Sequence, residues 1–373
     1  MKNYPVRADQ NGLTMIELMI AMLLGLLLMG GVVQIFVSSK QTFSVQEAQS
    51  RVQENGRLAM NFLPYDIRLA DFQGCRSRQK YTTNVIAKTI VMCPTRKNCA
   101  PNVDSRYWNL NGGVTGSDNV LRGTTDPVTG LPVVAAGTPV SALSIVAETD
   151  IINLQFGSSC GGHLVGDMTA YDVAIQLDAS NTCQLKQGWP FIISDCLDAD
   201  IARASSVVTS SRIQTVAHDT KNINNIDVNT SNHLRKAYRA GAEIYSIQSI
   251  AYFIARNPVG NNALYRRNNA TGTSEEMVEG VEDMQILYGE DTDNDNTANY
   301  YVDAGQVVAM QKVVSVKVSL LLRSLSNINV TSGPVIYTYN GITYNDSEVS
   351  APLVDRQLRK VFTSTVTLRN RLP

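Results

Sequence analysis

The sequence has few of the residues from which active sites are usually built. Only three histidines occur among its 373 residues, and they lie far apart, at His163, His218 and His233. It has no G-x-S-x-G, P-loop or H-E-x-x-H pattern, and therefore no hydrolase elbow, phosphate-binding loop or zinc-protease helix. These absences make an enzyme the weaker hypothesis, and no catalytic residue is predicted.

Paired C-x-x-C spacing is also absent, which argues against a structural zinc site. The six cysteines all lie in the middle of the chain, at Cys75, Cys93, Cys99, Cys160, Cys183 and Cys196. In an exported chain an even number predicts disulfides, and six cysteines allow about 15 connectivities. The short spacing between Cys93 and Cys99 makes that pair the first expectation, whereas in a cytosolic protein the same residues would be small buried hydrophobes.

Charge of one sign is not concentrated anywhere in the chain. The 33 acidic and 32 basic residues are interspersed, with no run of five or six like charges, so no nucleic-acid partner is expected. Hydrophobic residues make up 44% of the chain, which is enough for a sizeable packed core.

The N-terminus carries the feature that stands out. From Leu18 to Val37 the chain has no charge, and the run is long enough to cross the roughly 30 Å of a bilayer core as a helix. Lys2 and Arg7 in the preceding leader outweigh Asp9 and place the leader on the cytoplasmic side, with the bulk of the chain outside. No small-residue cleavage pattern follows Val37, so the segment is expected to remain in the mature protein.

Glu17 lies directly before this apolar run. An unpaired carboxylate in a bilayer costs about 2.5 to 3.5 kcal/mol or more, so its presence requires a function.

The residues GLTMIELMIAMLLGLL, from Gly12 to Leu27, resemble the processing site of type IV prepilins and type II secretion pseudopilins. The resemblance implies that a prepilin peptidase cuts after Gly12 and methylates the new N-terminus at Leu13, with Glu17 as the fifth mature residue. Many members of the family begin with Phe, so Leu13 is a mild departure.

A physical argument supports this assignment of Glu17. Cleavage after Gly12 would create an α-amine that can neutralise the carboxylate of a neighbouring subunit within a bundle of apolar helices. The alternative is a plain signal anchor whose glutamate lies at the cytoplasmic interface.

Beyond the apolar run, the spacing of Val45, Ala48, Val52, Ala59, Phe62 and Leu63 predicts an amphipathic continuation of the helix. Leu13 to Leu63 would form about 51 residues of helix, roughly 75 Å long, which Pro64 ends or kinks. The apolar stripe is interpreted as packing on a soluble domain. We expect a leader at 1–12, a transmembrane assembly helix at 13–37, its amphipathic continuation at 38–72 and a β-rich periplasmic domain at 73–373.

The remainder of the chain alternates short β-branched runs with Gly, Asn, Asp, Ser and Thr, which predicts antiparallel sheets. The fold class is therefore α+β and pilin-like, with one long helix packed on a domain that has two sheet regions. The stretches 102–139 and 222–232 are predicted to be long surface loops.

Several segments further resemble the PilW-type minor pilins, which are related to the J-type minor pseudopilins of type II secretion. They are residues 56–75, 194–200, 278–296, 313–324 and 359–371. Asp71 and Asn296 depart from the residues usual in the family. The resemblance implies a low-copy subunit that is first held in the inner membrane and then lies at the pilus tip. It would join other minor pilins and the major pilin to start assembly, and would help carry a tip adhesin. A J-type pseudopilin is the alternative.

Three aspartates at alternate positions, Asp291, Asp293 and Asp295, could direct oxygen ligands at one calcium ion, with further oxygens from Asn299 and Asp303. The Gly and Glu of an EF-hand loop are replaced by Asn296 and Val302. The alternative is a solvated hairpin loop without an ion, and any calcium would be structural rather than required.

Two rival functions rest on local patterns. Cys160 and His163 could be paired as nucleophile and base, although a disulfide cysteine beside a surface histidine is the preferred interpretation. Arg266 and Arg267 beside Tyr265 are the one hint of a DNA-uptake pilin, and a solvated turn is the preferred interpretation there.

Overall fold

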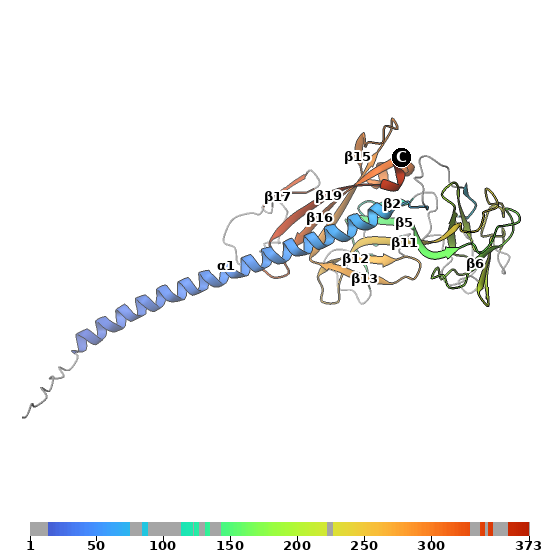
Figure 1. Cartoon of the computed structure of the whole chain (residues 1–373). Coiled ribbons are helices and arrows are strands. Elements are labelled where there is room, and N and C mark those ends of the chain that lie inside the picture. The colour runs from blue at the N-terminus through green and yellow to red at the C-terminus, as the bar shows by residue number, and fades with distance from the viewer. Residues whose placement is uncertain are drawn as a thin grey trace, which may run out of the picture.

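The computed structural model describes residues 14–74, 84–88, 113–121, 123–126, 131–134, 143–221, 227–328, 336–339, 342–345 and 357–372. It has one long helix and a β-rich domain at the C-terminal end of that helix (Figure 1). The predicted α+β class is thereby confirmed.

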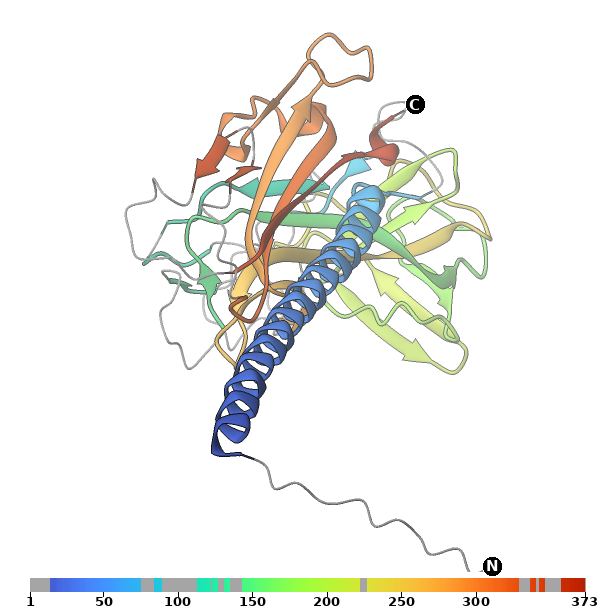
Figure 2. The same ribbon diagram turned by 90° about the vertical axis from the view of Figure 1, so that its left-hand side faces the viewer.

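Helix α1 (Met15–Leu69) begins at Thr14, whose side chain caps the first turn. Its first half projects away from the domain, while its second half lies along the strands (Figures 1 and 2). The buried positions in the second half, including Ala48, Val52, Ala59 and Leu63, recur at helical spacing, so one face of α1 enters the core. The predicted amphipathic continuation is therefore confirmed, except that Phe62 remains 38% exposed.

The helix does not end at Pro64 but continues to Leu69. A proline inside a helix removes one backbone hydrogen bond and costs about 3 kcal/mol. Leu63, Pro64 and Ile67 are all buried against the domain, and this burial offsets the cost. Tertiary packing therefore determines where the helix ends.

The described strands form a ten-stranded, a four-stranded, a three-stranded and a two-stranded sheet. The largest has the central order β1-β8-β7-β11-β12-β13. Strands β4 and β5 also pair with β11, β2 pairs with β5, and β3 pairs with β4. Its strands are β1 (Asn84–Val85), β2 (Val114–Ser117), β3 (Val133–Val134), β4 (Ile145–Val146), β5 (Ile151–His163), β7 (Pro190–Ser194), β8 (Ala199–Arg203), β11 (Glu243–Arg256), β12 (Asn262–Asn268) and β13 (Ser274–Glu279).

The four-stranded sheet has the order β15-β14-β16-β19 and the three-stranded sheet the order β6-β10-β9. Strand β17 (Ile336–Tyr339) pairs with β18 (Ile342–Asn345). The other strands are β6 (Ile175–Asp178), β9 (Ser206–Ser210), β10 (Ile213–Ala217), β14 (Val281–Glu290), β15 (Tyr300–Val302), β16 (Val313–Arg323) and β19 (Arg359–Thr367). The described part of the domain also has three 3-10 turns: η2 (Ala304–Gln306), η3 (Met310–Lys312) and η4 (Arg369–Arg371).

The main core lies where α1, the large sheet and the four-stranded sheet meet. It joins Leu63 and Ile67 of the helix to Leu154 of β5, Tyr252 of β11 and Val316 of β16. The domain and the second half of α1 therefore share one hydrophobic core.

Two details differ from the sequence prediction. The predicted loop at 102–139 contains strands β2 and β3, which are short and were obscured by the surrounding Gly, Thr and Pro. The sheets are mainly antiparallel as predicted, but β1–β8 and β3–β4 are parallel pairs. In each parallel pair only two residues of one strand pair with two of the other, which is too few to give a sequence signal.

Candidate functional site

The first half of α1 is an apolar surface with nothing packed against it. Among the described residues, α1 is the one helix long and apolar enough to cross a membrane, and its most apolar window is not buried at all. Large side chains such as Met15, Leu26 and Phe36 are each at least 68% exposed. A surface of this kind is stable only in a bilayer or against other apolar helices.

Glu17 lies in the first turn of α1 and forms a capping box with Thr14. Its Oε2 accepts the backbone N–H of Thr14 at 3.0 Å and the Thr14 hydroxyl at 2.9 Å, while the Glu17 N–H donates to the Thr14 Oγ1 at 3.3 Å. The Glu17 side chain is nevertheless exposed, so a second partner can reach it. Gly12 and Leu13, the predicted cleavage and methylation positions, lie outside the described residues.

Buried polar contacts attach the second half of α1 to the domain. Asp66, 6% exposed, accepts the Tyr252 hydroxyl at 2.7 Å and the Arg266 Nε at 2.8 Å. Asn55 donates to the backbone oxygen of Glu279 at 2.9 Å. Gly56 lets the Phe362 ring approach so closely that a Cβ at Gly56 would lie 2.3 Å from it.

The end of α1 is tied to the C-terminus of the chain. Asn370 Nδ2 donates to the backbone carbonyls of Arg68, Leu69 and Ala70 at 3.0 to 3.2 Å, and so caps the helix. Arg371 Nε donates to Asp71 Oδ2 at 2.8 Å, and both side chains are at least 98% buried.

Arg371 also donates to the carbonyls of Met310 and Val313. Asp71, the family departure noted in the sequence, thus holds the helix exit against the last turn of the domain. No pattern in the sequence indicates this pair, because its members lie 300 residues apart.

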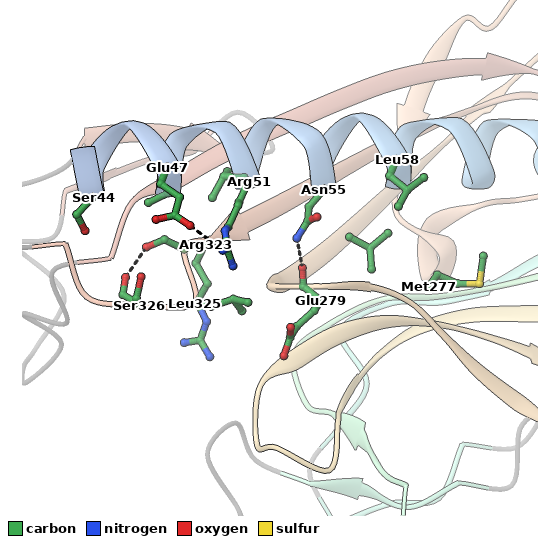
Figure 3. Close-up of a pocket in the computed structure, with 14 residues that line it drawn as sticks. Ser44, Glu47, Arg51, Asn55, Leu58, Met277, Glu279, Arg323, Leu325 and Ser326 are labelled. Atoms are coloured by element: carbon green, nitrogen blue, oxygen red, sulfur yellow. Dashed lines mark hydrogen bonds and ion pairs between the residues drawn. The ribbon is translucent and has the colours of Figure 1, made fainter. Parts of the chain in front are cut away.

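A groove of about 530 Å³ opens between α1, the end of β13 and the segment after β16 (Figure 3). Asn55 points across it to Glu279, while Glu47 and Arg51 form an ion pair of 2.7 Å along its helical wall (Figure 3). Neither histidine nor cysteine lies among the described residues that line it. The described lining residues therefore include neither a cysteine–histidine nor a serine–histidine pair.

The Cys160 and His163 pair is not a catalytic arrangement. Cys160 is bonded to Cys183, and exposed His163 contacts the backbone oxygen of Gly161. The interpretation of a disulfide cysteine beside a surface histidine is thus confirmed. Cys196 is also disulfide-bonded, whereas Cys75, Cys93 and Cys99, and with them the predicted Cys93–Cys99 pair, lie outside the described residues.

The Tyr265 to Arg267 segment is not the solvated turn that the sequence predicted. It belongs to strand β12, where Tyr265 is 6% exposed. Arg266 pairs with Asp66 of α1, and Arg267 donates to the Gly272 carbonyl at 2.7 Å and to Ser274 at 3.0 Å. Both arginines hold parts of the domain together, which removes the one hint of a DNA-binding surface.

The three aspartates of the candidate calcium loop do converge. Their carboxylate oxygens lie within 4.8 Å of one another, and Asp291 is 2% exposed. The Asp291 carboxylate accepts the backbone N–H of Asn294 at 2.6 Å and of Asn296 at 2.9 Å, which lowers its pKa.

Asn294 and Asn296 adopt left-handed conformations, with φ of 62° and 71°, as expected for asparagine in a tight turn. Asn299 Oδ1 accepts from Thr292, and Asp303 lies outside the cluster of three. The oxygen-only donor set fits a hard cation.

Comparison with protein families gives two matches. Residues 251–370 match the type IV pilus-assembly protein W (PilW), and residues 7–33 match the prokaryotic N-terminal methylation motif. No curated protein and no solved structure matches the chain. The first match covers the end of β11 and all of β12 to β19, and the second covers the end of the leader and the exposed start of α1. Together with the exposed apolar helix, the disulfide and the β-rich domain, these two matches support a minor pilin of the PilW type.

Proposed function

We propose that this chain takes part in starting type IV pilus assembly, as one subunit of a tip or priming complex with other minor pilins. A prepilin peptidase would cut after Gly12 and methylate Leu13. The chain would wait in the inner membrane with its domain in the periplasm. It would then become part of the pilus tip, beside a tip adhesin, with the major pilin added behind it.

The observation that carries the proposal is the division of α1 into two halves. The exposed half can pack only against lipid or other apolar helices, while the second half shares the core of the domain. When the apolar half of α1 moves, the domain must therefore move with it, because both are joined by one continuous helix. This is what a subunit needs if it is drawn from a bilayer into a filament.

Glu17 has a specific role in this proposal. Its carboxylate is exposed within an apolar surface, and it already serves as an acceptor at the helix start. The α-amine formed by cleavage would add a charged donor at the same end of a neighbouring helix. Pairing of the two charges would offset the cost of burial, which is about 2.5 to 3.5 kcal/mol for an unpaired charge.

A deletion strain tests the proposal when it is scored for surface pili and for secreted exoproteins. We expect pili to be lost and secretion to be normal, with rescue by the wild-type gene but not by Glu17→Ala. Glu17→Asp is the matched control, because it keeps the charge, and it should rescue at least in part. Loss of secretion with normal pili would assign the chain to the J-type pseudopilins instead, and no change in either would refute both assignments.

We also propose that Asp291, Asp293 and Asp295 bind a structural calcium ion. Three carboxylates within 4.8 Å repel one another, and a cation would relieve that repulsion. Calorimetric titration of the full chain in detergent should show calcium heat, and chelator should lower the melting temperature. Asp293→Asn should remove both effects, whereas the same exchange at the exposed Asp172, in another part of the domain, should leave them intact. An absence of heat together with unchanged melting would refute the site.

A further inference from the structure

Strand β9 (Ser206–Ser210) lies at an edge of the three-stranded sheet. Its five residues pair with β10 on one side, and β10 pairs with β6 on its other side. No described strand pairs with the second side of β9. Its outward backbone groups are therefore available to another strand.

The composition of β9 is unusual for an open edge. Proteins commonly protect edge strands with charge, proline or a bulge, because bare edges pair with other chains. The edge strand β13 carries Glu275, Glu276 and Glu279, and β19 begins with Arg359 and Lys360. Strand β9 reads SVVTS, has no charge or proline, and pairs with β10 without a register shift. Its central Val208 is 59% exposed.

The hairpin geometry identifies the outward amides. Ser210 pairs with Ile213 across the two-residue turn formed by Ser211 and Arg212, so this flanking pair exchanges hydrogen bonds within the hairpin. Hydrogen-bonded and non-hydrogen-bonded pairs alternate along an antiparallel ladder. The backbone groups of Val207 and Thr209 therefore face away from β10.

The position of this edge favours contact with another subunit. The sheet that contains β9 includes β6, which lies at the end of the domain farthest from the start of α1 (Figure 1). It is thus remote from the apolar surface that enters the bilayer or the helix bundle. A contact here would leave the helical contacts undisturbed.

We propose that β9 accepts an extended strand from a different pilin-like subunit, which adds to the edge as a fourth strand. An edge offers amides and carbonyls at strand spacing, so its complement is another strand rather than a helix. Self-pairing of β9 would close a two-fold dimer, whereas subunits stacked along a filament meet through unlike surfaces. The inference rests on the proposed function, since it specifies one contact of the assembly.

The test places a photo-crosslinking amino acid at Ser210 of the full-length chain in piliated cells, with Val259, 77% exposed in another turn, as the control position. We expect a crosslink from Ser210, and not from Val259, to an extended segment of another pilin-like subunit identified by mass spectrometry.

Two pairs of variants show whether backbone pairing is responsible. Thr209→Pro removes an outward N–H but no bond to β10, and should reduce crosslinking roughly tenfold or more, while Thr209→Val should not. Val208→Lys adds a charge to the edge without altering the backbone and should act in the same way, with Val208→Thr as its control. Melting temperatures of the variants would show that the domain remains folded.

The absence of a crosslink, a crosslink only to a second copy of this chain, or a crosslink that survives both Thr209→Pro and Val208→Lys would overturn the inference. The deletion strain separates this failure from that of the proposed function. If deletion removes pili but Val208→Lys restores them without a crosslink, the strand contact alone is wrong. If deletion leaves pili intact, the proposed function is wrong.

Discussion

Removal of the Arg371 side chain should destabilise the domain more than any exposed substitution. Arg371 is 2% exposed, and its guanidinium neutralises Asp71, which is equally buried. Arg371→Met keeps much of the volume but leaves a buried carboxylate without its cation, which typically costs about 3 to 5 kcal/mol. The carbonyls of Met310 and Val313 also lose their charged donor, and this loss is included in that range.

The measurement is urea unfolding of the full chain in detergent, followed by circular dichroism. Arg369→Met is the matched control, because Arg369 lies in the same 3-10 turn but is exposed. It should change the free energy of unfolding by no more than about 0.5 kcal/mol. Arg371→Met should lower it by about 3 to 5 kcal/mol.

A double-mutant cycle identifies the cause. Asp71→Gly removes the carboxylate and also relieves the left-handed backbone at Asp71, where φ is 64°. In the Asp71→Gly background, Arg371→Met should cost less by about 2 kcal/mol or more, because no buried carboxylate remains to be stranded. Additive effects of the two substitutions, or a cost below about 1 kcal/mol for Arg371→Met, would refute the argument that this pair ties the helix exit to the C-terminus.

Three further outcomes are expected. Gly56→Val should destabilise the chain by about 1 to 3 kcal/mol, because the valine side chain would overlap the Phe362 ring. Phe362→Ala should cost less in the Gly56→Val background than in the wild type. Unfolding titrations of the two single variants and the double variant test this. Replacing Cys160 and Cys183 together by serine should lower the free energy of unfolding by about 3 kcal/mol, since the disulfide closes a loop with a sequence separation of 23. Reductant should lower the free energy of unfolding less in the double variant than in the wild type. Burial raises the pKa of Asp150 to about 8, so between about pH 4 and pH 8 the folded state keeps a proton that the unfolded state has released. The stability that this proton contributes is fully present below about pH 4. It is lost as the pH rises to about 8, at up to about 1.4 kcal/mol per pH unit. Titrations between about pH 5 and pH 8 should therefore show a stability that falls more steeply with pH in the wild type than in Asp150→Asn, and equal slopes would contradict this assignment.

The sequence alone determined the local features of this protein. The uncharged run from Leu18 to Val37 requires an apolar environment, and Glu17 before it is recognisable because a charge there is costly. Alternating β-branched runs located most of the longer strands, including β11, β14 and β16, because a strand's pattern repeats every two residues and needs no distant information. The alternate aspartates at 291, 293 and 295 converge as predicted, since a tight turn is a local structure.

The tertiary structure decided every feature that depends on distant partners. The helix passes Pro64 because Leu63 and Ile67 are buried in the core that α1 shares with the sheets. Arg266 is a structural ion-pair partner because strand β12 brings it to Asp66, 200 residues away. Asp71 and Arg371 meet across 300 residues. Such contacts leave no periodic trace in a single sequence, because their geometry is created only when the whole core has packed.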